Sequence, residues 1–301
     1  MELSTRDRRA GAHSPLLAPA LVLAVAVALL AGCGSGGSEE QETLRVGLIP
    51  NQSPESVQAE YAPLGDYLSE ELGMEVDLNV PTSYPAVVEA MASDNLDLAY
   101  FGGLTYAQAR DRAEVERLVT EVNPYTGTTK YHTVIIVPRD SEVREIEELE
   151  GEVFAFGSVS STSGSLYPSI MLADAGIDYR TDLGETLYTG GHDATAQAVA
   201  NGQVAAGGVE DRILFDLQEE GAVEEAAVRI IGESEEVEGY PWVVRSALPD
   251  DLEDRVAEAF LNIEDPELLD LLRAEGYERV AAADYDYVEE RARELDLLTE
   301  Q

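Results

Sequence analysis

The repeated alternation of strand and helix patterns constrains the fold of this chain more than any other feature. Short apolar runs typical of strands are followed by segments with helical spacing, and a glycine ends several of the helical segments. The series covers residues 44–137 and begins again near residue 153. Because parallel strands need a crossover connection, usually a helix, this order predicts α/β sheets. The restart predicts two α/β lobes instead of one.

The expected elements can be assigned by residue number. We expect strands at 44–49, 74–80, 96–101, 134–137, 153–156, 187–189, 204–209, 229–231 and 242–244. We expect helices at 57–72, 84–91, 105–113, 165–175, 193–201, 251–261, 267–275 and 285–295. The expected fold class is therefore α/β, with two lobes of mixed sheets flanked by helices.

The boundaries of the lobes follow from this order. Lobe 1 is expected to comprise residues 43–137 and 242–301, and lobe 2 residues 138–241. Ligands bind to open α/β sheets where the carboxyl ends of strands meet helix starts. Two facing lobes therefore predict a central cleft that closes around a ligand by a hinge motion.

The first 32 residues have the features of a lipoprotein signal peptide. Three arginines precede an apolar run at 16–30, which is shorter than the ~20 residues of a membrane-spanning helix. The run ends in Leu30-Ala31-Gly32-Cys33, which resembles a lipobox, so we expect lipid attachment at Cys33. Residues 33–42 are expected to be a flexible tether. The chain would then be exported and anchored at the outer face of the cytoplasmic membrane or in the periplasm.

The charge of the chain is strongly negative, with 19 basic and 60 acidic residues. Removing residues 1–32 takes away three arginines and two acids, which leaves 16 basic and 58 acidic residues and a net charge of −42. Nucleic-acid binding is excluded because it needs a basic face. An acidic surface with Lys130 as the only lysine favours a halophilic protein over an ordinary acidic one. Any anion site must work through local dipoles and hydrogen bonds.

Three segments combine a strand end, a small or hydroxyl-bearing loop and a helix start. They are residues 81–84, 160–164 and 190–193. A helix start exposes unpaired N–H groups and about half a positive charge, so converging starts can bind an anion without lysine or arginine. Ser161, Thr162 and Ser163 could surround a tetrahedral oxyanion, although hydroxyls also serve as ordinary helix caps. Nucleotide binding is not indicated because there is no Gly-Lys-Ser/Thr motif.

His192 begins one of these helices, and its ring could donate a hydrogen bond to a ligand or to its own turn. Asp193 next to it raises the alternative of a catalytic group, with Ser161 or Ser163 as nucleophile. However, the sequence has no nucleophile-elbow spacing and no set of histidines with metal-ligand spacing, so we expect no enzyme, metal or cofactor. Tyr84 and Tyr131 are further candidates, because a tyrosine hydroxyl can donate to an oxyanion without adding charge; each could also serve packing alone.

Taken together, the chain resembles the phosphonate/phosphite/phosphate-type periplasmic solute-binding proteins of ABC importers. The resemblance covers nearly the whole chain after Cys33, and its most specific part is Ser-Thr-Ser-Gly at 161–164 combined with Gly-His-Asp at 191–193. Other matching segments are 66–68, 72–73, 83–91, 97–102 and 198–204. It implies a type II periplasmic-binding-protein fold, an ABC permease as partner and a monomeric receptor. It also implies that the oxyanion is held by Tyr84, Tyr131, Ser161, Thr162, Ser163 and His192.

The chain departs from aminoalkylphosphonate binders of this family, which hold the ligand ammonium with carboxylates. Tyr240 stands where one of these acids would align, and Glu210 and Asp211 lie near the other. This favours a ligand without a cation, such as phosphite, phosphate or a simple alkylphosphonate. The alternatives are a receptor for a sulfonate or a pyrimidine precursor, a sensory partner protein, or a secreted hydrolase of phosphorus esters.

Overall fold

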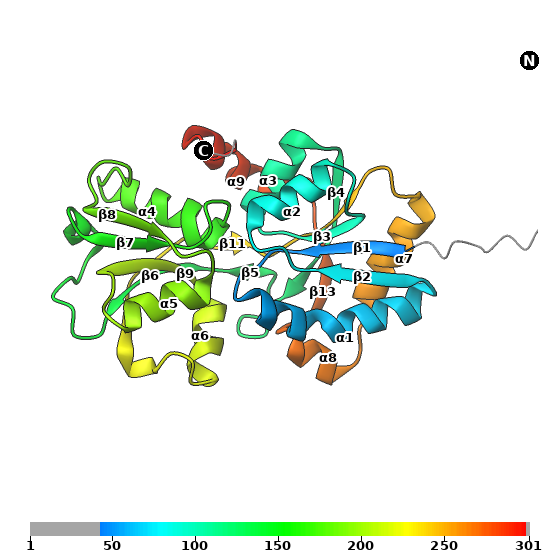
Figure 1. Ribbon diagram of the computed structural model, residues 1–301, viewed down its shortest axis with the longest axis horizontal. Helices are drawn as coiled ribbons and strands as arrows, with labels where there is room; N and C mark the ends of the chain where they lie inside the picture. Colours follow the sequence, from blue (N-terminus) through cyan, green and yellow to red (C-terminus); the bar gives the residue numbers. More distant parts are fainter. Residues whose placement is uncertain (1–42, 299–301) are drawn as a thin grey trace, which may run out of the picture. The chain divides into compact units, whose positions relative to one another are not determined.

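The computed structural model describes residues 43–298, which form helices and strands around two mixed sheets (Figure 1). The signal peptide expected at 1–32, the lipid attachment at Cys33 and the tether at 33–42 lie outside the described residues. Within 43–298, no helix is both long and apolar enough to cross a membrane.

The first sheet has six strands in the order β13-β4-β12-β3-β1-β2. These strands are β1 (Thr43–Leu48), β2 (Glu75–Asn79), β3 (Leu98–Tyr100), β4 (Val115–Val122), β12 (Trp242–Arg245) and β13 (Gly276–Arg279). β1 pairs in parallel with β2 and β3, whereas β12 and β13 pair antiparallel. The helices of this half, which we call lobe 1, are α1 (Pro54–Leu72), α2 (Tyr84–Ala92), α3 (Gly103–Arg112), α7 (Asp250–Leu261), α8 (Pro266–Leu271) and α9 (Asp286–Glu294).

The second sheet has five strands in the order β10-β6-β9-β7-β8. Its strands are β6 (Thr133–Pro138), β7 (Val153–Phe156), β8 (Glu185–Tyr188), β9 (Ala206–Glu210) and β10 (Val228–Glu233). The helices of this half, lobe 2, are α4 (Tyr167–Asp174), α5 (His192–Ala200) and α6 (Asp211–Glu219). Short turns of helix lie at Ile146–Leu149, Thr162–Leu166, Glu225–Ala227 and Ala282–Tyr285. The expected α/β class with two mixed sheets is confirmed.

The twofold alternation along β6 explains how helices cover both faces of the second sheet. Val134 and Ile136 lie in one apolar cluster, which includes residues of α5 and α6. Ile135 and Val137 lie in the other, which includes Met171 of α4. Successive side chains of a strand point to opposite faces, so one apolar run supplies both layers of the core. Figure 1 shows α4 on one side of this sheet and α5 on the other.

The crossing from lobe 1 to lobe 2 differs from the expected position. The strand expected in lobe 1 at 134–137 is β6, and it pairs with β9 and β10 of the second sheet. β4 belongs to the first sheet and β6 to the second. The chain therefore crosses from lobe 1 to lobe 2 between these two strands, earlier than the expected residues 137–138. The crossing contains β5 (Lys130–Tyr131), which pairs antiparallel with β11 (Val237–Glu238) of the returning chain. β12 then pairs with β3 and β4.

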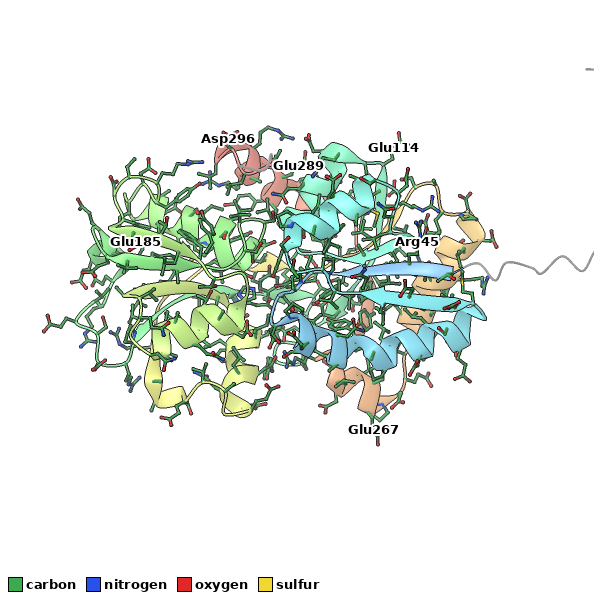
Figure 2. All side chains as sticks on the ribbon, in the orientation of Figure 1. Arg45, Glu114, Glu185, Glu267, Glu289 and Asp296 are labelled. Carbon is green, nitrogen blue, oxygen red and sulfur yellow. The ribbon has the colours of Figure 1, made fainter. Side chains whose placement is uncertain are left out.

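Exposed acidic side chains lie on both lobes. Exposed examples are Glu114, Glu185 and Glu267, which are labelled in Figure 2. This agrees with the excess of acidic over basic residues in the composition, which does not favour binding of a polyanion.

Candidate ligand-binding site

Helix starts from both lobes meet at one buried place. Tyr84 is the first residue of α2 in lobe 1, and His192 is the first residue of α5 in lobe 2. Ser161 caps the helical turn Thr162–Leu166, which leads into α4. Burial raises the pKa of the Tyr84 hydroxyl, and the neighbouring Ser161 side chain opposes this rise. Tyr84, Ser161 and His192 are each 1% exposed. Because Tyr84 neighbours Ser161, and the Ser163 hydroxyl lies 3.4 Å from His192 Nε2, the structure brings the three segments together.

The turn that carries the three hydroxyls is held in place by its own contacts. The Ser161 hydroxyl accepts a hydrogen bond from the Gly164 N–H at 2.9 Å. The Gly157 N–H donates to the Gly164 carbonyl at 2.8 Å, and a Cβ on Gly164 would lie only 3.1 Å from the Gly157 Cα. Glycine is therefore required for this close approach of backbone to backbone. The turn that carries the hydroxyls of residues 161–163 would therefore need little reorganisation to bind a ligand.

Thr162 connects this turn to a fourth helix start, that of α3, a helix that was expected from the sequence but not as part of the site. Its hydroxyl oxygen accepts a hydrogen bond from the Leu104 N–H of α3 at 2.9 Å. The cap of α3 is Gly102, which has no side-chain oxygen to mark it as a ligand-binding helix start in the sequence. The Thr162 hydroxyl oxygen thus accepts a hydrogen bond that joins the two lobes, and its O–H can still donate to a ligand.

Replacing Thr162 by valine should destabilise the protein, because the Leu104 N–H would lose its acceptor in a buried position. An unsatisfied buried donor costs about 1–3 kcal/mol, so we expect a loss of that size in the free energy of unfolding by urea. Thr162→Ser is the matched control, since it retains the hydroxyl. Equal stabilities of Thr162→Val and Thr162→Ser would contradict the assigned contact.

His192 is positioned as a neutral donor. Its Nδ1 accepts from the Glu210 N–H at 3.4 Å, which leaves the proton of a neutral ring on Nε2. Nε2 lies 3.4 Å from the Ser163 hydroxyl. Burial, with a further contribution from the positive charge of Arg212, lowers the pKa of His192 to about 3. The ring therefore stays uncharged near neutral pH and can donate through Nε2–H.

The neighbour of His192 has a structural contact instead of a catalytic one. The Asp193 carboxylate accepts from the Ser53 N–H at 3.2 Å. The His192 N–H donates to the Asn51 carbonyl at 2.9 Å. Both contacts join α5 to the loop that follows β1, so they hold lobe 2 against lobe 1. This arrangement gives no support to a serine nucleophile activated by His192 and Asp193.

Tyrosine rings form the side of the site next to the crossing strands. Tyr131 is 1% exposed, and its ring centre lies 5.6 Å from that of Tyr240. Tyr240 stacks on Tyr100 at 5.3 Å. Burial raises the pKa of the Tyr131 hydroxyl far above its usual range, and nearby Ser163 opposes this rise. The Tyr131 hydroxyl makes no hydrogen bond of normal geometry to Ser163 or to any other described residue. The buried Tyr131 hydroxyl is therefore a donor with capacity for a ligand.

The two acids considered from the sequence have different surroundings. Both Asp211 contacts are to backbone: one carboxylate oxygen accepts from the N–H groups of His132 and Arg212, at 3.1 and 2.8 Å. Glu210 is fully buried, and its carboxylate accepts from the Tyr240 hydroxyl and from Arg212 Nε, the latter at 2.6 Å. Glu210 thus belongs to the side-chain network next to His192, and Asp211 serves the start of α6.

Arg212 and Glu121 were not identified from the sequence. Arg212 Nη2 donates to Glu121 Oε1 at 3.0 Å, so one guanidinium is shared by two buried carboxylates. Burial raises the pKa of Glu210 to about 7, and the charge of Arg212 opposes this rise. A cavity of about 30 Å³, enough for about one water molecule, adjoins the network; its lining includes Asn51, Tyr100, Glu121, Glu210 and Arg212.

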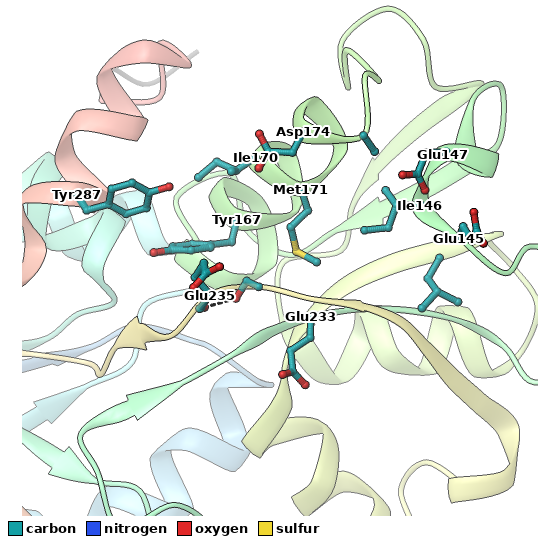
Figure 3. Close-up of a pocket in the computed structure, with 13 residues that line it drawn as sticks. Glu145, Ile146, Glu147, Tyr167, Ile170, Met171, Asp174, Glu233, Glu235 and Tyr287 are labelled. Atoms are coloured by element: carbon teal, nitrogen blue, oxygen red, sulfur yellow. Dashed lines mark hydrogen bonds between the residues drawn. The ribbon is translucent and has the colours of Figure 1, made fainter.

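A larger hollow lies elsewhere and does not fit an anion. It is a groove of about 510 Å³ along α4 and β10 (Figure 3). Its charged lining residues are Glu145, Glu147, Asp174, Glu233 and Glu235. Five carboxylates with no basic residue in the lining would repel an oxyanion, so we place the candidate site at the converging helix starts. Among residues 43–298, no group of three or more potential ligands could hold a metal ion.

Comparison with known proteins identifies the family of this chain. Residues 46–286 match the family model described as ABC transporter, phosphonate, periplasmic substrate-binding protein. The phosphate-import protein PhnD of Mycolicibacterium smegmatis is 27% identical over 254 residues, which cover 79% of this chain and 79% of that protein. The probable ABC transporter phosphite binding protein PhnD1 of Prochlorococcus marinus is 26% identical over 275 residues, which cover 85% of this chain and 90% of that protein.

The solved structures show the same fold. A structure of PhnD1 from Prochlorococcus marinus in complex with methylphosphonate matches with a TM-score of 0.78 at 24% identity, over 85% of this chain and 99% of that one. The expected type II periplasmic-binding-protein fold is thereby confirmed. From the extent of the family match, the chain belongs to the periplasmic substrate-binding proteins of phosphonate ABC transporters, a family of binding proteins and not of enzymes.

Proposed function

We propose that this chain is an exported, lipid-anchored receptor that captures phosphite, phosphate or a simple alkylphosphonate and delivers it to its ABC permease. The observation that carries the proposal is the convergence of Tyr84, Ser161 and His192 at helix starts from both lobes. The names of the relatives support the same ligand class: one is a phosphate-import protein, one a probable phosphite binding protein.

Binding would rely on neutral donors, because the surface of the chain repels anions. The hydroxyls of residues 161–163, the tyrosine hydroxyls of 84 and 131 and the Nε2–H of His192 can all donate without carrying charge. Each hydrogen bond to a charged group contributes about 1.5–3 kcal/mol, so several together can outweigh the removal of the oxyanion from water. Long-range repulsion would be reduced in high salt, where screening is strong.

The contacts between the lobes support capture by closure. Thr162 with Leu104, and His192 with Asn51, join the two lobes directly beside the proposed ligand position. A ligand held by Tyr84 from lobe 1 and by residues 161–163 from lobe 2 would favour this closed arrangement over an open one. A permease can then distinguish the loaded receptor by its shape.

Calorimetric titration of the chain lacking residues 1–32 tests the proposal. Phosphate, phosphite, methylphosphonate and 2-aminoethylphosphonate should be compared in high salt, with an alkanesulfonate and a pyrimidine precursor as alternatives. We expect binding of at least one of the first three compounds, with 2-aminoethylphosphonate weaker. Binding of the sulfonate or the pyrimidine precursor alone would favour a receptor of a different ligand class.

The lipid anchor can be tested separately. When the full chain is expressed in a bacterium that processes lipoproteins, we expect it in the membrane fraction, with Cys33 carrying a diacylglyceryl group and usually a further acyl chain. Cys33→Ser should shift the protein to the aqueous phase on detergent partition, because it removes the only attachment point. Mass spectrometry of the amino-terminal peptide measures the modification, and an unmodified Cys33 in the wild type would contradict the anchor.

A further inference from the structure

We infer that Arg212 is a selectivity residue: its guanidinium takes the place that a cationic group of a ligand would otherwise fill, so the site favours oxyanions without an ammonium group. This inference rests on the proposed function and deepens it. It concerns the network of Glu121, Glu210 and Arg212 described above, together with the hydroxyl of Tyr240.

The position of the guanidinium is fixed from several sides. Nε donates to Glu210 of β9, and Nη2 donates to Glu121 of β4, so the contacts come from both lobes. The guanidinium also lies over the Tyr131 and Tyr240 rings, 5.4 and 5.7 Å from their centres. Cation–π contacts of this kind add to the ion pairs where water is excluded. Arg212 is only 8% exposed, so it has little freedom to move aside for a ligand.

The two carboxylates already have hydrogen-bond partners within the protein. One Glu210 oxygen accepts from Arg212, and the other accepts from the Tyr240 hydroxyl. Glu121 Oε1 accepts from Arg212 and from the Tyr100 hydroxyl, the latter at 3.1 Å. An ammonium group entering this network would lose its water and meet a guanidinium instead of an unpaired carboxylate. Burying a charge without a free partner is strongly unfavourable.

The network is close enough to the proposed oxyanion position to affect ligand choice. The Glu210 N–H contacts His192 Nδ1, and the charge of Arg212 contributes to lowering the pKa of that ring. Tyr131, a proposed oxyanion donor, packs under the guanidinium. An amino group joined to a phosphonate by a short carbon chain would therefore lie within the field of Arg212. A simple alkyl group or a P–H group would carry no charge to be repelled.

Four variants and the wild type test the inference, with calorimetric affinities for methylphosphonate and 2-aminoethylphosphonate measured on each. In Arg212→Met, the Glu210 carboxylate is free to receive an ammonium, so the ratio of the two affinities should move toward 2-aminoethylphosphonate by at least about tenfold. That is the change expected for about 1.4 kcal/mol. Arg212→Lys is the matched control, because it retains the positive charge and should keep a ratio near that of the wild type.

The other two variants separate selectivity from folding. In Glu210→Gln combined with Arg212→Met, no carboxylate is available at position 210 and the shift should disappear. Glu210→Gln alone leaves Arg212 with one carboxylate fewer, so the ratio should move the opposite way, toward methylphosphonate, even if Arg212→Met does not fold. If the wild type binds methylphosphonate but the affinity ratio is unchanged in both Arg212→Met and Glu210→Gln, the inference is wrong while the proposed function still holds. A wild type that binds none of phosphate, phosphite and methylphosphonate would overturn the proposed function as well.

Discussion

Replacing Ser161 and His192 together by alanine is expected to weaken the binding of the phosphorus oxyanion by at least about 100-fold, because two hydrogen bonds to a charged group contribute about 3–6 kcal/mol. Both side chains are buried at the meeting point of the helix starts. Neither replacement introduces a charge or a larger side chain. Titration calorimetry with the ligand that binds the wild type most tightly measures the loss.

The matched control changes the same residue types outside the proposed site. Ser169 of α4 donates to the Ser165 carbonyl in the preceding turn, and His132 contacts the Ser234 carbonyl. Alanine at both of these positions should leave the affinity within a few-fold of the wild type. If the Ser161 and His192 variant binds as tightly as this control, the assignment of the oxyanion site is wrong.

Acid should destabilise the protein through His192. The pKa of this ring is lowered from its ordinary value of 6.5 to about 3, mainly by burial. Between these two values the unfolded chain binds a proton that the folded chain does not, so stability is fully present above pH 6.5 and is lost as the pH falls toward 3. The slope approaches about 1.4 kcal/mol per pH unit, which amounts to roughly 5 kcal/mol over the window.

Urea unfolding of the wild type and of His192→Gln between pH 4 and 7 measures this contribution. The variant has no titrating group at position 192, so the wild type should lose stability relative to the variant as the pH falls. Glu60 and Glu210 act in the opposite direction, because burial raises the pKa of each to about 7 and their contribution is lost as the pH rises. These acids are present in both proteins, so the difference in slope isolates His192. Equal slopes would show that the ring is charged or exposed in the folded state.

The elements that the sequence predicted correctly are those with a strong local pattern. The helix expected at 57–72 is α1, whose buried positions include Val57, Tyr61, Leu64 and Leu68 at helical spacing, and it ends at Gly73 in the left-handed conformation. The segments around Ser161 and His192 were recognised because hydroxyls and glycines at helix starts are visible in a short window. That these segments lie close together could be predicted because the α/β order places the carboxyl ends of the strands toward a shared site.

The elements that the sequence did not predict depend on distant partners. β4 contains Glu121, which a local pattern places at the surface, but its carboxylate is buried against Arg212, 91 positions along the chain. The same reason hid Arg212, since a single basic residue after two acids is typical of a solvated helix start. The first strand of lobe 2 was placed in lobe 1 because an apolar run at 134–137 does not show which sheet it joins.

The position of the bound ligand is the most direct measurement of the central claim, which is that neutral donors at helix starts of both lobes hold the oxyanion. A crystal structure of the chain with the ligand that calorimetry identifies would show it. We predict the phosphorus-bound oxygens within hydrogen-bonding distance of residues 161–163, His192 and Tyr84, between the two lobes. Ligand density in the acidic groove along α4, or on one lobe without contact to the other, would contradict the account.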